Sequence, residues 1–95
     1  MYREISVFDL KRLNNINIID IRSIEKYNDN HIPGSINIPK ILIVKDYYKY
    51  LDKIKTYYIY CQKGEESKKV CRLLSNLGYK VINIKGGYES WILNN

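Results

Sequence analysis

The sequence has few of the residues that build metal centres, and it has no long apolar segment. A single histidine and two cysteines occur in 95 residues. Structural zinc sites draw four ligands from such residues at characteristic spacings, and none of those spacings is present, so we expect no metal and no cofactor. No apolar run approaches the roughly 18 to 20 residues of a membrane-spanning helix, so we also expect no membrane partner.

The N-terminus has no apolar region typical of a signal peptide, which favours a cytoplasmic location. In that compartment Cys61 and Cys71, ten residues apart, are expected to be reduced thiols rather than a disulfide. A chain of 95 residues is long enough for one hydrophobic core and too short for two. We therefore interpret residues 1–95 as a single domain.

The chain is basic, with a formal net charge of +6. Its lysines are spread along the sequence, without an arginine-rich block and without a nucleic-acid-binding motif. We therefore expect no nucleic-acid partner. A basic surface does attract small anions by electrostatic steering.

Strand-like and helix-like segments alternate, which is typical of an α/β domain with a parallel sheet. The strand-like segments are 16–20, 35–38, 57–60 and 81–84. Five segments are helix-like. The first has a capping signal at Ser6 and Asp9 and carries Leu10 and Leu13, and the second runs from Ser23 through Tyr27. The others cover 41–51, the stretch from Glu66 to a stop at Gly78, and 88–93.

Cys61 follows the strand at 57–60 and precedes a short loop that leads into a helix. Backbone N–H groups wrapped around a sulfur at a helix N-terminus stabilise negative charge there. Such a site lowers the pKa of a thiol below its free value of about 8.5. On this segment alone a small hydrophobic cysteine at the end of a core strand is an equally good interpretation.

Two further segments make the pattern specific. The first contains Asp20 and Arg22, an acidic and an aromatic residue at Glu25 and Tyr27, and then His31-Ile-Pro-Gly-Ser-Ile-Asn-Ile-Pro39. The second runs from Gly78-Tyr79 through Gly86-Gly87 to Trp91. Together with the cysteine loop, these segments resemble the rhodanese family over essentially the whole chain.

The resemblance implies a three-layer α/β fold, in which a central, mostly parallel, five-stranded sheet has helices on both faces. It also implies a sulfurtransferase that passes a sulfane sulfur from thiosulfate or a persulfide donor, through a persulfide on Cys61, to a thiol, cyanide or protein acceptor. Ligands of open parallel sheets bind beyond the carboxyl ends of the strands. Cys61 and Asp20 both lie at such ends, so we expect them to face one crevice.

The family's roles can be placed on this sequence residue by residue. Cys61 is expected to be the nucleophile, with Asp20 and Arg22 as supporting residues. Lys63 stands where animal-type thiosulfate sulfurtransferases carry a lysine that binds the sulfonate end of the substrate, and Lys26 stands where they have an arginine, whose bidentate contact lysine does not reproduce. The expected substrate-binding residues are Gln62, Lys63, Gly64, Glu65, Glu66, Ser67 and Lys26.

The loop departs from the family at one position. Many single-domain members read C-x-x-G-x-R-S, and here Glu66 replaces the arginine and follows Glu65. Two carboxylates favour the start of the helix, but they lower the positive potential at the thiol and repel anionic substrates. We expect Lys63, Lys68 and Lys69 to offset part of this effect, and thiosulfate to react slowly.

Other functions remain as alternatives. A non-catalytic or weakly active interaction or sulfur-carrier module is one of them. A phosphatase or arsenate reductase on the same fold needs an arginine six residues after the cysteine, where this chain has Ser67 and no arginine before Arg72. A Cys–His hydrolase would have to use His31. Cys71 is interpreted as a partly buried thiol, with a resolving role as the alternative.

Overall fold

A computed structural model describes residues 2–94. Strands and helices alternate along the chain, in the order β1 (Arg3–Ile5), α1 (Val7–Leu10), β2 (Asn17–Asp20), α2 (Ile24–Asp29), β3 (Ser35–Asn37), α3 (Lys40–Tyr50), β4 (Thr56–Tyr60), α4 (Glu65–Asn76), β5 (Lys80–Ile84) and α5 (Gly87–Leu93). The α/β fold class predicted from the sequence is therefore confirmed.

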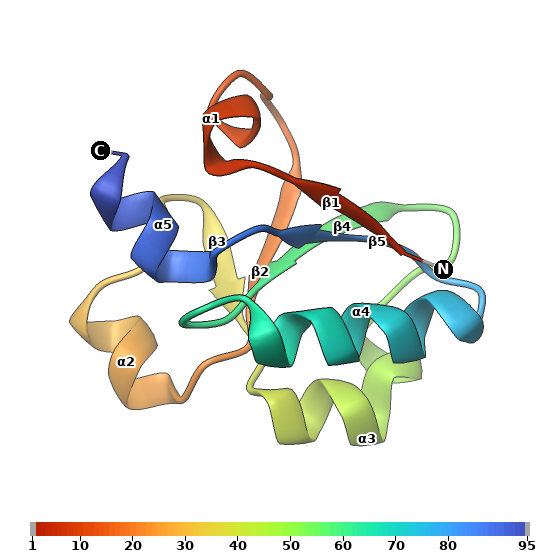
Figure 1. Cartoon of the computed structure of the whole chain (residues 1–95). Helices are drawn as coiled ribbons and strands as arrows, with labels where there is room; N and C mark the ends of the chain where they lie inside the picture. Colours follow the sequence, from red (N-terminus) through yellow and green to blue (C-terminus); the bar gives the residue numbers. More distant parts are fainter. Residues whose placement is uncertain (1, 95) are drawn as a thin grey trace.

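The five strands form one sheet in the order β1-β5-β4-β2-β3, and every neighbouring pair is parallel. Helices α3 and α4 cover one face of the sheet, and α1 and α5 cover the other (Figure 1). Parallel strands need a crossover connection, which explains why a helix lies between every two strands that are consecutive in the sequence. Because β4 is the middle strand, its carboxyl end lies where several loops converge.

Each face of the sheet has its own hydrophobic core. Alternate residues of a strand point to opposite faces, so Ile19 and Ile59 pack under α3 and α4, whereas Ile18 and Tyr60 pack under α1 and α5. The three inner strands β5, β4 and β2 are buried on both faces, as is typical of parallel sheets. The covering helices supply Ile43, Val70 and Leu74 on one side and Val7, Leu10 and Tyr88 on the other.

The N-terminal segment differs from the sequence-based prediction in two ways. The strand β1, which pairs with the outer side of β5, was not predicted, because it has three residues and of these only Ile5 is half-buried. The first helix ends at Leu10, so Leu13 lies beyond it with 39% of its surface exposed. Asn15 has a left-handed backbone (φ 55°), and the chain bends at this residue before it enters β2.

The remaining elements lie within a few residues of their predicted positions. Helix α3 begins one residue earlier than expected and is kinked at Asp46 (φ −118°, ψ 33°). Helix α4 ends at Asn76, and Gly78 (φ 95°) follows it with the left-handed backbone that glycine favours. None of the helices in residues 2–94 is long and apolar enough to cross a membrane.

Candidate active site at the Cys61 loop

Cys61 lies directly after β4, where the chain leaves the middle of the sheet. Residues 62–64 connect it to α4, whose first residue is Glu65. Cys61 as a residue is only 6% exposed, but it lines a pocket at the surface. The fold therefore places the cysteine at the carboxyl edge of the sheet and at the N-terminus of a twelve-residue helix.

Two backbone N–H groups donate to the sulfur of Cys61. The nitrogen of Gly64 lies 3.1 Å from Sγ and that of Ser67 lies 3.3 Å from it. Gly64 has φ 96°, a left-handed conformation that turns its N–H towards the sulfur. These donors and the positive end of the α4 dipole together stabilise a negative charge at Sγ.

The start of α5 holds the loop from the other side. The backbone nitrogens of Tyr88 and Glu89 donate to the carbonyl oxygens of Cys61 and Gln62, at 2.9 and 3.0 Å. A Cβ atom at Gly87 would lie 2.3 Å from the Cys61 oxygen, so only glycine permits this approach. The sequence pattern predicts merely a chain turn at Gly87, because pairing of backbone groups between distant segments leaves no local signal.

A pocket of about 240 Å³ opens at Cys61. It is lined by Lys26, Cys61, Gln62, Lys63, Glu65 and Glu66. The structure thus brings together six of the predicted site residues. Ser67 and Asp20 are fully buried and do not line this pocket. A neighbouring pocket shares Lys26, Gln62 and Lys63 and is also lined by Arg22 and Tyr88.

The acidic pair of the loop is partly neutralised. Glu66 forms ion pairs with Lys40 and, at 3.7 Å, with Lys69. The hydrogen bond and charge of Lys40, followed by the charge of Lys69, hold the pKa of Glu66 below its ordinary value. Lys69 was an expected partner, whereas Lys40, distant in sequence, was not.

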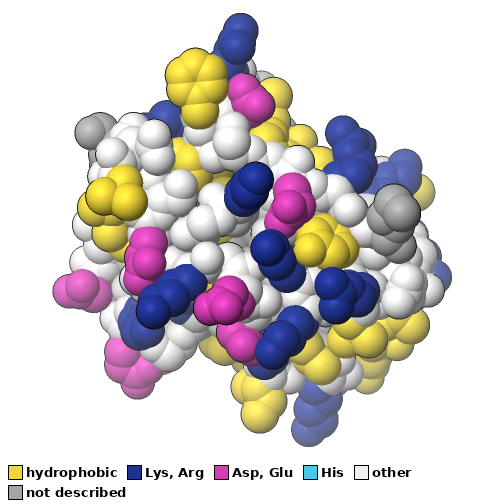
Figure 2. All heavy atoms as spheres, in the orientation of Figure 1, with side chains coloured by type: hydrophobic (Ala, Val, Ile, Leu, Met, Phe, Trp, Pro, Cys, Tyr) yellow, Lys and Arg dark blue, Asp and Glu magenta, His cyan; other side chains and the backbone are white. Residues whose placement is uncertain are grey.

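The other cations around the loop behave differently. Within residues 2–94, Lys26, Lys63 and Lys68 form no ion pair, so any effect of Lys63 and Lys68 on the loop is that of an unpaired charge. Acidic and basic side chains are intermixed on the face shown in Figure 2. That face has no continuous basic patch of the kind that binds nucleic acid.

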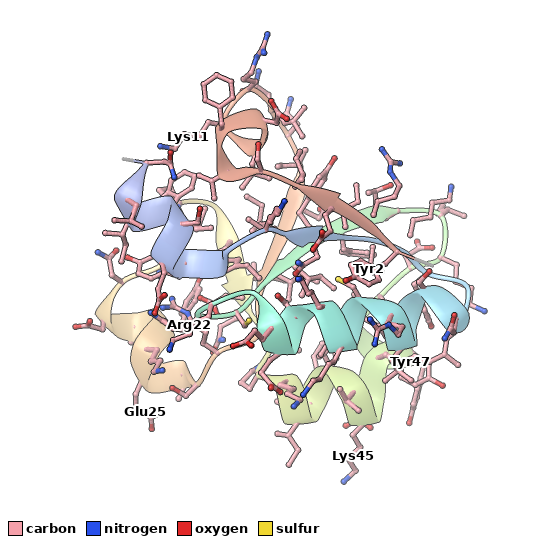
Figure 3. All side chains as sticks on the ribbon, in the orientation of Figure 1. Tyr2, Lys11, Arg22, Glu25, Lys45 and Tyr47 are labelled. Atoms are coloured by element: carbon pink, nitrogen blue, oxygen red, sulfur yellow. The ribbon has the colours of Figure 1, made fainter. Side chains whose placement is uncertain are left out.

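Asp20 and Arg22 form a buried ion pair beside the loop. The Arg22 Nη2 lies 2.7 Å from Asp20 Oδ2, and its Nε contacts both carboxylate oxygens. Burial disfavours the charged guanidinium, but the hydrogen bond and charge of Asp20 outweigh it and raise the pKa of Arg22. Arg22, labelled in Figure 3, also donates to Oε1 of the loop residue Gln62 at 3.1 Å. Asp20 therefore contacts the Cys61 loop through Arg22 and does not line the Cys61 pocket.

Tyr60 completes this cluster and was not expected to take part in it. Its hydroxyl donates to Asp20 Oδ2 at 2.6 Å. Burial, followed by the hydrogen bond to Asp20, raises the pKa of Tyr60. A strand tyrosine carries no sequence signal for such a contact, because its partner lies 40 residues away.

The remaining candidates are placed away from the reactive position. Cys71 is fully buried rather than partly buried, and burial, followed by the charges of Cys61 and Glu4, raises its pKa to about 12. His31 stacks on Tyr27 with ring centroids 3.8 Å apart, and its Nδ1 lies 2.8 Å from the Tyr27 oxygen. Its partners are therefore not those of a Cys–His dyad. Within residues 2–94, no group of three or more His, Cys, Asp or Glu side chains is placed to hold a metal ion.

Comparison with known proteins supports a role in sulfur transfer. The family model described as a rhodanese-like domain matches residues 9–94. The thiosulfate sulfurtransferase GlpE of Coxiella burnetii is 30% identical over 95 residues, which cover 96% of this chain and 88% of GlpE. A Bacillus subtilis protein named as a sulfur carrier, YrkF, is 36% identical over 77 residues, but these are 80% of this chain and only 41% of YrkF.

Solved structures agree with the fold. A rhodanese-related protein from Thermoplasma volcanium superposes with a TM-score of 0.88 at 32% identity, covering 99% of this chain and 94% of the other. The rhodanese-like domain of an Anabaena protein has a TM-score of 0.88 at 27% identity, covering 100% and 76%. The three-layer arrangement with a five-stranded sheet is shared with these structures.

Proposed function

Because the chain belongs to the rhodanese-like domain family, we propose that it is a sulfurtransferase that takes a sulfane sulfur from thiosulfate or a persulfide donor and carries it on Cys61. The Cys61 thiolate attacks the outer sulfur of thiosulfate. A new sulfur–sulfur bond forms, the bond within thiosulfate breaks, and its electron pair leaves with sulfite. A thiol, cyanide or protein acceptor then attacks the outer sulfur of the persulfide and releases the thiolate.

The observation that supports this proposal most directly is the pair of N–H donors from Gly64 and Ser67 at Sγ. Donors fixed in advance stabilise negative charge without reorganising during the reaction. Lys26 and Lys63 line the pocket in front of the sulfur and form no ion pair within residues 2–94. We infer that they bind the anionic end of the donor.

A second candidate function is a sulfur carrier, which accepts a persulfide and hands it to a protein without turning over thiosulfate. The relative named as a sulfur carrier favours it. The ion pairs of Glu66 with Lys40 and Lys69 reduce its repulsion of anions, which favours direct use of thiosulfate. The two functions differ in whether thiosulfate alone loads Cys61.

Intact mass spectrometry of the purified protein tests the proposal. We expect a gain of one sulfur atom after thiosulfate and its loss after cyanide. Cys61→Ser should abolish the gain and Cys71→Ser should retain it, because Cys71 is buried and its pKa is raised. Loading by a protein persulfide but not by thiosulfate would identify a carrier, and loading of Cys61→Ser would refute the assigned nucleophile.

A further inference from the structure

Behind Cys61, a chain of side-chain hydrogen bonds runs through the buried side of the loop to the edge strand. Ser67 Oγ lies 3.3 Å from Cys61 Sγ and 2.5 Å from Asn83 Oδ1. Asn83 Nδ2 lies 2.9 Å from Glu4 Oε2. Asn83 and Glu4 are register partners in β5 and β1, so their side chains point to the same face of the sheet.

The carboxylate at the end of this chain fixes the direction of every bond in it. Glu4 only accepts hydrogen bonds when ionised, so the NH₂ group of Asn83 has to face Glu4. The Asn83 oxygen then faces Ser67, and the Ser67 hydroxyl has to donate its single hydrogen to it. Towards Cys61, the Ser67 oxygen is left with lone pairs only.

The other contact of this hydroxyl does not change the result. Ser67 Oγ also lies 3.2 Å from the Gly64 oxygen, which accepts a backbone bond from Lys68 as well. Whether the hydrogen points to Asn83 or to Gly64, it does not point to Cys61. The Ser67 oxygen therefore accepts from the S–H of the thiol and faces a thiolate with lone pairs.

We propose that Asn83 and Glu4 are positioning residues, which keep the hydrogen of the Ser67 hydroxyl turned away from Cys61. In this way they favour the protonated thiol of Cys61 over its thiolate. Ser67 and Asn83 are fully buried, so water does not replace a bond that the hydroxyl gives up. Turning the hydroxyl towards a thiolate would leave the Asn83 oxygen without its donor, which is costly for a buried group. The N–H groups of Gly64 and Ser67 act in the opposite direction, and the balance of the two sets the reactivity of the sulfur.

The chain of hydrogen bonds from Ser67 to Glu4 orients these groups and does not conduct a proton, because a carboxamide is not a proton carrier under ordinary conditions. Other titratable or charged groups surround the sulfur on the elements packed against it: Cys71, Glu65 and Glu66 of α4, Lys63 of the loop, Lys26 of α2 and Glu89 of α5. Substitutions of Asn83 and Glu4 leave these side chains in place, but Glu4→Gln also removes a negative charge that acts on Cys71. A comparison of each variant with and without the Ser67 hydroxyl therefore isolates the contribution of the oriented hydroxyl.

The test is the pH profile of alkylation of Cys61 by iodoacetamide, a neutral reagent, followed by mass spectrometry of the peptide that contains Cys61. Asn83→Leu removes the acceptor and frees the Ser67 hydroxyl to donate to the thiolate. We expect the pH of half-maximal rate to fall by about one unit, since hydrogen bonds to charged groups are the stronger ones. Glu4→Gln allows the Asn83 amide to turn over, and should shift the profile in the same direction by less.

The matched control is the same pair of substitutions in a Ser67→Ala background, as in a double-mutant cycle. Without the hydroxyl, we expect Asn83→Leu not to move the profile, and Glu4→Gln to move it only through the loss of its charge, by less than when Ser67 is present. An unmoved profile with Ser67 present, or an equal shift without it, overturns the proposal. If Asn83→Leu fails to fold, Glu4→Gln decides the question, because Glu4 is exposed. The experiment follows the thiol itself, so its result does not depend on whether Cys61 transfers sulfur.

Discussion

Lys63 and Lys26 face the Cys61 pocket from two different segments of the chain, and both side chains are exposed. We expect Lys63→Ala to raise the KM for thiosulfate about two- to fivefold and to leave kcat nearly unchanged. An exposed charge contact is worth little, and a contact made equally in the ground and transition states affects KM alone. Lys26→Ala should act in the same direction, and both effects should shrink as salt is added.

Lys45→Ala is the matched control for these substitutions. Lys45 lies on α3 and points away from the rest of the molecule (Figure 3). Lys45→Ala therefore removes the same charge as Lys63→Ala without changing the pocket. Steady-state transfer at two salt concentrations separates the outcomes. A rise in KM with Lys45→Ala as large as with Lys63→Ala would show that only net charge matters, contrary to a role for Lys63 in the pocket.

Lys40 does not line the Cys61 pocket, but it forms an ion pair with Glu66, which does. Lys40→Ala should leave the Glu66 carboxylate with Lys69 alone, at 3.7 Å, so that it repels thiosulfate and lowers kcat/KM about twofold or more. In Lys40→Ala/Glu66→Gln, the value should return to that of Glu66→Gln alone. A loss that persists in the double variant would mean that Lys40 acts on the substrate by another route.

The N-terminus of α5 is the element that keeps the cysteine loop in place. We expect Gly87→Ala to lower the free energy of unfolding by about 2 to 5 kcal/mol, because overpacking costs about 1 to 3 kcal/mol and a left-handed backbone costs alanine about 1 to 2 kcal/mol. The new Cβ would displace the Cys61 oxygen, 2.3 Å away. Sulfur loading of Cys61 should therefore fall together with stability. Urea unfolding and intact mass measure the two effects.

Gly34→Ala separates the two costs. Gly34 also has a left-handed backbone, with φ 85° against 61° at Gly87, but a Cβ there would meet no atom within 4 Å. Gly34→Ala should lower the free energy of unfolding only by the backbone contribution, about 1 to 2 kcal/mol, and should load sulfur normally. Equal losses of stability and loading in both variants would show that the close approach of α5 to the loop is unimportant.

Local patterns in the sequence predict elements that are long or periodic. The apolar spacing of α4 and the aromatic run of β4 are enough to place Cys61 between a strand and a helix. The edge strand β1 is missed because its pairing with β5, and not its own three residues, makes it a strand. Pairing between segments far apart in sequence is invisible to any local pattern.

The same distinction holds within the site. Cys61, Lys63 and Lys26 were predicted because family motifs and loop position identify them, and the structure places all three at one pocket. Lys40 and Asn83 were not predicted, since their partners Glu66 and Ser67 lie 26 and 16 residues away. The resemblance identified Cys61 as the candidate reacting group, and the fold identified the residues around it.

Considered as a whole, the molecule is held together at the carboxyl edge of the sheet by the Asp20–Arg22–Tyr60 cluster. Arg22 joins the ends of β2 and β4 to the segment after α2, since it also donates to the Asn30 oxygen at 2.7 Å. Its guanidinium lies 4.2 Å from the ring centroid of Tyr88 on α5. Breaking a buried ion pair costs about 3 to 5 kcal/mol, so the cluster is a large part of the stability of a domain this size.

The cluster makes stability depend on pH in the alkaline range. The pKa of Tyr60 is raised in the fold by burial and by the hydrogen bond to Asp20, whereas an unfolded tyrosine has a pKa of about 10. A raised pKa contributes stability that is fully present below about pH 10 and is lost as the pH rises above it, because the unfolded chain then loses a proton that the fold retains. Arg22, whose pKa is also raised, stays charged throughout this window.

We therefore expect the stability advantage of the wild type over Tyr60→Phe to shrink as the pH rises from 9 to above 10. At pH 7, Tyr60→Phe should cost about 1 to 3 kcal/mol, since it leaves a buried oxygen of Asp20 short of a donor. Urea unfolding at closely spaced pH values measures the difference, and the other nine of the ten tyrosines are common to both proteins and cancel. Tyr48→Phe is the control, because Tyr48 is 61% exposed and its removal should give no such trend. A difference between wild type and Tyr60→Phe that stays constant across this range would show that the Tyr60 proton is held no more tightly in the fold than in the unfolded chain.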